Sequence, residues 1–260
     1  MNLITLTTDF GTDDWFVGTM KGVILAINPR ARIVDVTHAI PRGDIRAGAL
    51  ALLQAYAFFP AGTIHLAVVD PGVGSERPAI AMRSGKFVFL GPDNGVLSFA
   101  AGREAVRSAR HVTSLKLKLP QVSRTFHGRD VFAPVAAHLS LGMRWSELGP
   151  RVAEWQRLRW PEPIRDGRTL RGEVIWLDRF GNAITNLPAT MDLRLSDVRV
   201  KNRSLGAPST HYQAVPTGKP LVLAGSGGLL EIAVNGGSAE LKFGLRLGTP
   251  VTATMGLGGV

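Results

Sequence analysis

The chain has 260 residues, and 45% of them are hydrophobic, which indicates a folded protein with a substantial core in one large or two modest domains. It contains no cysteine, which excludes disulfides, thiolate metal sites and a cysteine nucleophile. The net charge is +10, but the basic residues are scattered along the sequence, so we predict no nucleic-acid partner. There is neither an apolar run of the ~20 residues that span a bilayer nor a secretory signal, so we predict a cytoplasmic protein with no membrane partner.

The first part of the chain alternates strand-like with helix-like segments. Apolar runs predict strands over residues 3–8, 32–37, 63–69 and 87–90. Apolar stripes at helical spacing predict helices over residues 13–27, 44–59 and 130–141. This alternation is typical of an α/β layer, so we predict that residues 1–155 form an N-terminal α/β domain with a largely parallel sheet.

The pattern changes after residue 155. Residues 156–170 are rich in Trp, Arg and Pro and are predicted to be a linker. Short strand-like runs separated by turn residues follow, at 173–177, 183–187, 221–224, 229–234 and 250–255, with no convincing helix among them. We predict that residues 171–260 form a small C-terminal all-β barrel domain.

Carboxylates follow two of the predicted strands. Asp9 ends the first strand, and Asp70 ends the third and precedes a Gly-rich loop, 71–75. Ligands in open α/β sheets bind beyond the carboxyl ends of the strands, so both are candidate site residues, although either could merely cap the turn that follows it. Arg77 is close enough in sequence to fold back and pair with Asp70.

Histidines are the next candidates. His127 lies in a loop just before a predicted helix, where functional residues concentrate, and it could be catalytic or structural. His38 and His65 lie in or beside predicted strands and are interpreted as packing or capping residues. In the second domain, the turn 178–182 fits ordinary hairpin chemistry, and Gly225–Gly228 lacks the strand-then-helix context of a dinucleotide site.

Taken together and in order, these segments resemble one family over nearly the whole chain. The sequence is similar to the SAM hydroxide adenosyltransferases, the SAM-hydrolase branch of the fluorinase and chlorinase superfamily. The matching segments are LTTDFG (6–11), VGTMKG (17–22), DVTH (35–38), VVDPGVGSER (68–77), GPDNG (91–95), TFHGRDVFAP (125–134), DRFGN (178–182) and GSGGLLEIAVN (225–235).

The resemblance implies an activity and a set of roles. It implies that water attacks C5′ of S-adenosylmethionine and gives adenosine and methionine. Asp70, Arg77 and His127 match the family's catalytic set, and we expect Arg77 to stabilise developing hydroxide while the other two orient water and accept its proton. The residues that match substrate-binding positions are Asp9 for the ribose, Asp70 itself, Asp178 for the methionine ammonium, and Asn182, Ser226, Glu231 and Val234 near the adenine and the amino-acid end. The resemblance also implies a homotrimer whose site lies between subunits, with no metal and no other cofactor.

Three other activities are weighed beside hydrolysis. Halogenation is disfavoured, because a carboxylate at Asp70 would repel a halide. The acids Asp9, Asp13 and Asp14 are similar to the calcium-binding clusters of metal-dependent nucleoside hydrolases, although the last two also suit the first turn of a helix. A non-catalytic SAM- or adenosine-binding protein would use the same pocket.

Overall fold

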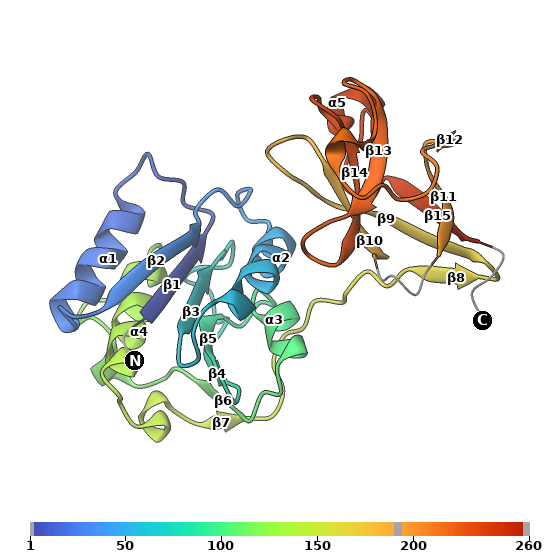
Figure 1. The fold of residues 1–260 in the computed structure, drawn as a ribbon. Coiled ribbons are helices and arrows are strands. Elements are labelled where there is room, and N and C mark those ends of the chain that lie inside the picture. The colour runs from blue at the N-terminus through green and yellow to red at the C-terminus, as the bar shows by residue number, and fades with distance from the viewer. Residues whose placement is uncertain (1–2, 190–193, 257–260) are drawn as a thin grey trace. The chain divides into compact units, whose positions relative to one another are not determined.

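The computed structural model describes residues 3–189 and 194–256. The chain divides into two compact units, with the boundary between Arg159 and Trp160. Figure 1 shows the first unit in blue to green and the second in yellow to red. Each unit has its own buried apolar cluster.

The first unit contains a mixed seven-stranded sheet. Its strand order is β2-β1-β3-β5-β4-β6-β7. The strands are β1 (Leu3–Thr8), β2 (Arg32–Thr37), β3 (Ile64–Val68), β4 (Ala79–Arg83), β5 (Val88–Pro92), β6 (Ser108–His111) and β7 (Arg151–Val152). Only β2, β1, β3 and β5 pair in parallel, while β4, β6 and β7 pair antiparallel to their neighbours.

The prediction of a largely parallel sheet is therefore only partly correct. The reason lies in the connection between β4 and β5, a tight turn in which Ser84 Oγ accepts a hydrogen bond from Phe87 N at 2.9 Å. So short a connection has no room for the crossover that parallel strands need, and it forces an antiparallel hairpin. Strands β4, β6 and β7 were not predicted from the sequence, because they are short and lie outside the strand–helix alternation.

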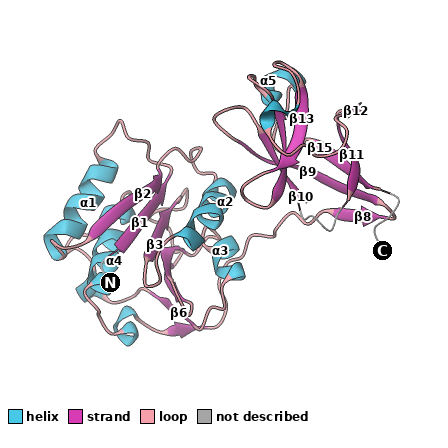
Figure 2. Ribbon diagram, in the orientation of Figure 1, coloured by secondary structure: helices cyan, strands magenta, loops and turns pink. Residues whose placement is uncertain are grey.

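Helices cover both faces of this sheet (Figures 1 and 2). Helices α1 (Phe16–Ile27) and α4 (Ala133–Ser140) pack together on one face, and α2 (Ile45–Ala55) and α3 (Ser98–Arg103) pack together on the other. The predicted helix over 130–141 differs in detail, because a π-helical turn, Gly128–Phe132, precedes α4. The core between α1, α4 and the sheet includes Ile4, Leu6, Met20, Leu66 and Phe132, all fully buried.

The second unit is built around antiparallel strands in the order β12-β11-β15-β9-β10-β14-β13, with β8 paired to β9. Their bounds are β8 (Ile164–Asp166), β9 (Thr169–Leu177), β10 (Ala183–Pro188), β11 (Leu195–Val200), β12 (Arg203–Ser204), β13 (Pro220–Ala224), β14 (Leu229–Val234) and β15 (Pro250–Met255). The sheet is curled into a half-barrel, which agrees with the predicted all-β domain; among the described residues, no strand pairing joins β12 to β13 to close it.

One helix in this unit was not predicted from the sequence. Helix α5 (Ala239–Phe243) is capped at its start by Ser238, whose side chain accepts a hydrogen bond from Leu241 N, and at its end by Gly244 in the left-handed conformation. It is too short for its apolar spacing to stand out in the sequence, so only its two capping residues could have revealed it.

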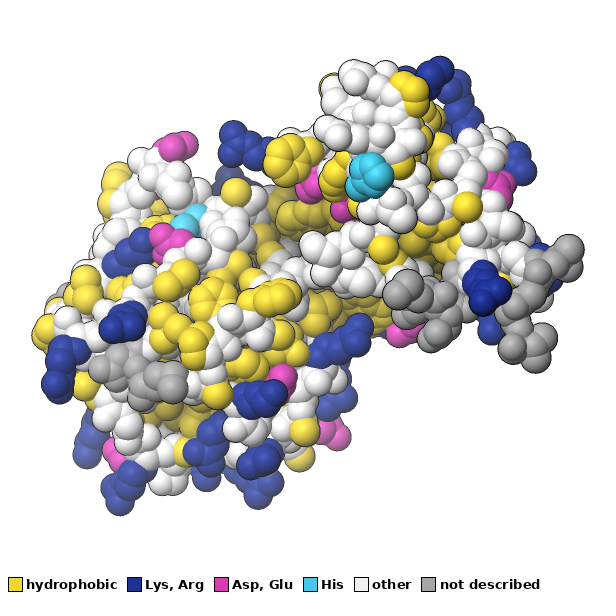
Figure 3. All heavy atoms as spheres, in the orientation of Figure 1, with side chains coloured by type: hydrophobic (Ala, Val, Ile, Leu, Met, Phe, Trp, Pro, Cys, Tyr) yellow, Lys and Arg dark blue, Asp and Glu magenta, His cyan; other side chains and the backbone are white. Residues whose placement is uncertain are grey.

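In the part of the chain that the structure describes, no helix has both the length and the apolar character needed to cross a membrane. On the face seen in Figure 3, Lys and Arg side chains are dispersed among polar and apolar ones.

Candidate functional site

The parallel strands bring the predicted carboxylates to one edge of the first unit's sheet. Strands β1 and β3 are neighbours, with Thr8 opposite Val68 at their carboxyl ends. Asp9 follows the last residue of β1 directly, and Asp70 follows β3 after one residue, Val69. Both therefore emerge at the edge where open α/β sheets bind their ligands.

Asp70 forms a forked ion pair with Arg77. Arg77 Nε donates to Asp70 Oδ1 at 2.9 Å, and Arg77 Nη2 donates to Asp70 Oδ2. The side chains are only 12% exposed for Arg77 and 4% for Asp70, so this is not a solvated surface pair. Burial and the two-point geometry make such a contact both stronger and more directional than an exposed ion pair.

His127 completes this cluster from a distant part of the chain. It stands immediately before the π-helical turn, and its Nδ1 lies 2.8 Å from Arg77 Nη2. A guanidinium can only donate, so Nδ1 is the acceptor, and a neutral imidazole then carries its proton on Nε2. Burial and the positive charge of Arg77 both lower the pKa of His127 below its usual 6.5, which keeps the ring neutral.

A glycine allows the two segments of this cluster to approach each other. Gly74, in the loop between Asp70 and Arg77, has a φ of +79°, and a Cβ built on it would lie 2.1 Å from the carbonyl oxygen of Arg124. Only glycine tolerates both conditions. The loop that carries Asp70 and Arg77 can therefore lie against the segment that leads to His127.

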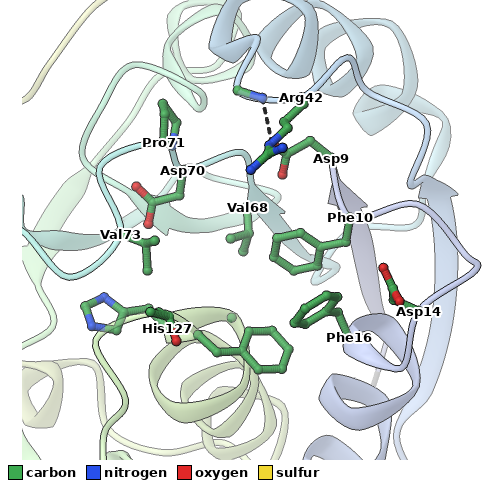
Figure 4. A pocket seen from close by; sticks show the side chains of 14 residues that line it. Asp9, Phe10, Asp14, Phe16, Arg42, Val68, Asp70, Pro71, Val73 and His127 are labelled. Carbon is green, nitrogen blue, oxygen red and sulfur yellow. Dashed lines mark hydrogen bonds between the residues drawn. The ribbon is translucent and has the colours of Figure 1, made fainter.

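The cluster opens onto a cavity of about 680 Å³. Figure 4 shows Asp70 and His127 on one side of it and Asp9 with Phe10 on another. The other lining residues include Asp14, Phe16, Arg42, Val68, Thr125 and Phe126. A volume of this size fits a nucleoside-sized ligand, and the lining combines aromatic rings with a few polar groups, as small-molecule sites do.

The side chain of Asp9 is hydrogen-bonded to the backbone of Gly43, in the loop before α2. Its Oδ2 accepts a hydrogen bond from Gly43 N at 2.8 Å, which is the dashed line in Figure 4. The remaining lone pairs of the carboxylate can accept hydrogen bonds from hydroxyl groups of a ligand in the cavity.

In the second unit, Asp178 organises the turn between β9 and β10. Its Oδ1 accepts hydrogen bonds from Phe180 N at 2.8 Å and Asn182 N at 2.9 Å, and its Oδ2 accepts one from Asn182 Nδ2 at 3.0 Å. Asn182 is buried. The turn also needs Gly181, whose φ is +78° and which lies against Ser238.

Glu231 lies near this turn and has a partner that the sequence analysis missed. It is 8% exposed on β14, and its Oε1 accepts a hydrogen bond from Tyr212 Oη at 2.6 Å. Burial and the nearby charge of Asp178 raise the pKa of Glu231 above its usual 4.5, although the Tyr212 bond opposes them. The same bond, with burial, raises the pKa of Tyr212 to about 12. No local pattern around Tyr212 could have revealed a contact with a residue 19 positions away.

The last two candidates differ in their surroundings. Ser226 is exposed in the turn between β13 and β14, where Gly228 N donates to Gly225 O at 3.0 Å. Val234 is buried at the end of β14, with Pro220 of β13 opposite it. Within residues 3–189 and 194–256, no group of three or more His, Asp or Glu side chains has the arrangement that could hold a metal ion.

Comparison with known families defines the class of protein. The model of the SAM hydroxide adenosyltransferase N-terminal domain matches residues 4–149, and that of the C-terminal domain of the same family matches residues 172–252. The chain belongs to the SAM hydroxide adenosyltransferase family.

Individual relatives agree with this assignment. The chain is 40% identical to the (R)-S-adenosyl-L-methionine hydrolase of Salinispora arenicola, over 97% of this chain and 98% of the relative. It is 27% identical to a fluorinase of an Actinoplanes species, with 97% of each protein covered. A solved structure of an uncharacterized conserved protein from Thermotoga maritima superposes with a TM-score of 0.90 at 36% identity, covering 97% of this chain and 99% of that one.

Proposed function

We propose that this protein hydrolyses S-adenosylmethionine to adenosine and methionine. The observation that carries the proposal is the Asp70–Arg77–His127 cluster, which opens onto a cavity that Asp9 also lines. Membership of the family, and the hydrolase activity named for the Salinispora arenicola relative, support it. The lower identity to the fluorinase and the carboxylate at Asp70 favour water over a halide as the nucleophile.

The chemistry requires an aligned nucleophile more than an acid. The sulfonium of the substrate is a cation that leaves as a neutral thioether, so the leaving group needs no proton. Holding a water molecule in line with the C5′–S bond can supply up to ~7–11 kcal/mol of the barrier reduction in favourable cases. The partly buried cluster is suited to that task because its three side chains are hydrogen-bonded to one another.

The hydrogen bonds of the cluster divide the roles. Since Arg77 donates to His127 Nδ1, the neutral ring presents an Nε2–H that can orient the oxygen of a water molecule. The water oxygen forms a bond to C5′, the C5′–S electrons remain on sulfur, and the water proton passes to the carboxylate of Asp70 and then to solvent. In this scheme Arg77 holds both groups, and Asp70 rather than His127 accepts the proton.

We further propose that substrate recognition is shared with the second unit of a neighbouring subunit in a homotrimer. Asp178 and Glu231 place two carboxylates near each other, an arrangement suited to the ammonium group of methionine. Asn182, Ser226 and the Val234 backbone are proposed to contact the remaining polar groups of the substrate, and Asp9 the ribose hydroxyls. Membership of the SAM hydroxide adenosyltransferase family supports this arrangement. Measurement of the oligomeric state in solution tests it, and we expect a trimer.

The test is product analysis with purified protein and S-adenosylmethionine. We expect equal amounts of adenosine and methionine, unaffected by EDTA or by added fluoride or chloride. Asp70→Ala and His127→Ala should abolish turnover while substrate still binds. Full turnover in both variants would refute the assigned chemistry.

The other outcomes identify the alternatives. Loss of activity in EDTA, with release of a free base from nucleosides, would indicate a metal-dependent nucleoside hydrolase. Binding of adenosine or S-adenosylmethionine without any product would indicate a binding protein. A halogenated nucleoside in the presence of halide would indicate a halogenase.

A further inference from the structure

Asp9 and Phe10 line the cavity, and the chain on both sides of them is hydrogen-bonded to a buried histidine, His38. His38 follows β2 and is 6% exposed. Its carbonyl oxygen accepts a hydrogen bond from Gly11 N at 2.8 Å, and its Nδ1 lies 2.8 Å from Thr8 Oγ1. His38 therefore contacts the chain on both sides of the two residues that line the cavity.

The hydroxyl of Thr8 links His38 to the backbone of Phe10. Thr8 Oγ1 accepts a hydrogen bond from Phe10 N at 3.3 Å, which occupies one of its lone pairs. The hydroxyl can then donate its proton to His38 Nδ1, provided that this nitrogen is unprotonated. Thr8 is fully buried, so both bonds are shielded from competing water.

The other side of the imidazole faces an ion pair. His38 Nε2 lies 3.1 Å from Asp35 Oδ1, off the direction of a good hydrogen bond, so the contact is electrostatic. Asp35 Oδ2 in turn accepts a hydrogen bond from Lys21 Nζ at 2.6 Å. A carboxylate on this side favours the tautomer with its proton on Nε2, which leaves Nδ1 free to accept from Thr8.

We propose that His38 is a positioning residue for substrate binding, which acts through Thr8 to fix Asp9 and Phe10 at the cavity wall. The inference rests on the proposed function and deepens it, because the ribose-binding carboxylate depends on a residue that does not line the cavity. Among the described residues, the His38 side chain forms its hydrogen-bond and ion-pair contacts with Thr8 and Asp35 and none with the Asp70–Arg77–His127 cluster, so it should govern affinity rather than the chemical step.

Strand β1, which carries Thr8, also supplies a matched control. His65 Nδ1 lies 2.8 Å from Thr5 Oγ1, so a second buried histidine makes the same contact with a second threonine of β1. His65 is surrounded by the rings of Tyr56, Phe59, Phe87 and Phe89, and none of these lines the cavity. Substitution there removes an equivalent hydrogen bond without reaching the site.

The experiment compares variants that keep or remove the Thr8 bond. In His38→Asn, the amide oxygen can replace Nδ1 as the acceptor, whereas in His38→Gln the amide reaches toward Asp35 instead. Thr8→Val removes the hydroxyl at nearly constant shape, and Thr8→Ser restores it. For each variant we measure KM and kcat for S-adenosylmethionine, adenosine affinity by calorimetry, and thermal unfolding. The controls His65→Gln and Thr5→Val remove the equivalent bond and are measured in the same way.

We expect KM and the adenosine dissociation constant to rise about fivefold in His38→Gln, as for the loss of one net hydrogen bond, with kcat within about twofold. The rise should be at least as large in Thr8→Val, which also removes the acceptor of the Phe10 N–H. His38→Asn and Thr8→Ser should recover most of the affinity. The His65→Gln and Thr5→Val controls should lower the unfolding temperature without changing KM. Equal losses of affinity at both histidines, or unchanged affinity in the folded His38→Gln and Thr8→Val proteins, would overturn the proposal. If the wild-type protein does not hydrolyse S-adenosylmethionine, the proposed function fails, and adenosine affinity alone decides the role of His38.

Discussion

The two units differ in the charge of the groups that surround their site carboxylates. In the first unit, Asp70 is paired with Arg77, whose guanidinium also reaches His127. In the second unit, Glu231 has a neutral partner, Tyr212, and a second carboxylate, Asp178, close enough to raise its pKa. One cluster has its charge balanced inside the protein, and the other holds an excess of negative charge.

This difference indicates different tasks. A balanced, mutually bonded cluster keeps its geometry whatever occupies the cavity, which suits the alignment of a nucleophile. An unbalanced pair of carboxylates is more stable when a cation is bound beside it, which suits recognition of a charged substrate group. We therefore expect changes in the first cluster to lower kcat and changes in the second to raise KM.

The largest expected effect is at the balanced cluster. Arg77→Lys keeps the positive charge but cannot bond both Asp70 oxygens and His127 at once. We expect kcat to fall about 10²–10³-fold, the range for loss of one organising donor in an active site, with little change in substrate affinity. Steady-state kinetics and calorimetric binding measure the two quantities. Arg144→Lys, in an exposed ion pair with Glu147, is the control and should leave both unchanged.

A backbone change should disturb the same cluster less directly. In Gly74→Ala, the new Cβ would collide with the carbonyl oxygen of Arg124, and the residue would keep an unfavourable positive φ. We expect the free energy of unfolding to fall by about 1–3 kcal/mol, together with a lower kcat. Gly102→Ala, on helix α3 where nothing lies within 4 Å of the added carbon, should leave kcat unchanged and should not lower the free energy of unfolding, because alanine favours a helix more than glycine does. A fully active and stable Gly74→Ala protein would show that the loop does not pack closely against Arg124.

The smallest expected effect is at the unbalanced pair. Tyr212→Phe removes the hydrogen bond that lowers the pKa of Glu231, so this pKa should rise further. We expect KM for S-adenosylmethionine to rise about fivefold at neutral pH, as for one lost hydrogen bond, and the acid limb of kcat/KM to move to higher pH. Glu231→Gln should abolish the sensitivity to Tyr212→Phe, which a double-mutant cycle measures.

Stability gives this prediction an independent check. Because the pKa of Glu231 is raised in the folded state, folding is favoured while the group is protonated, and that advantage is lost as the pH rises through the folded pKa. Glu231→Gln should therefore stabilise the protein at neutral pH and lose this gain below the ordinary value of 4.5. Denaturant unfolding at both pH values tests the sign, and a variant that is less stable at neutral pH would contradict it.

The sequence by itself determined those features that depend on local pattern. Strands β1 and β2 have the bounds that their apolar runs predict, and the positions of Asp9 and Asp70 follow from where β1 and β3 end. The pairing of Arg77 with Asp70 was also predictable, because only seven residues separate them along one loop. Motif order in the sequence was enough to indicate the family.

Tertiary structure alone decided the contacts between segments that are far apart along the chain. His127 meets Arg77 across 50 residues, and His38 meets Thr8 across 30, and neither contact has a local sequence signal. The antiparallel half of the first sheet was likewise set by the tight turn between β4 and β5 rather than by hydrophobic period. The physical reason is that apolar spacing records which face of a segment is buried, whereas a hydrogen bond between distant side chains depends on how the segments pack.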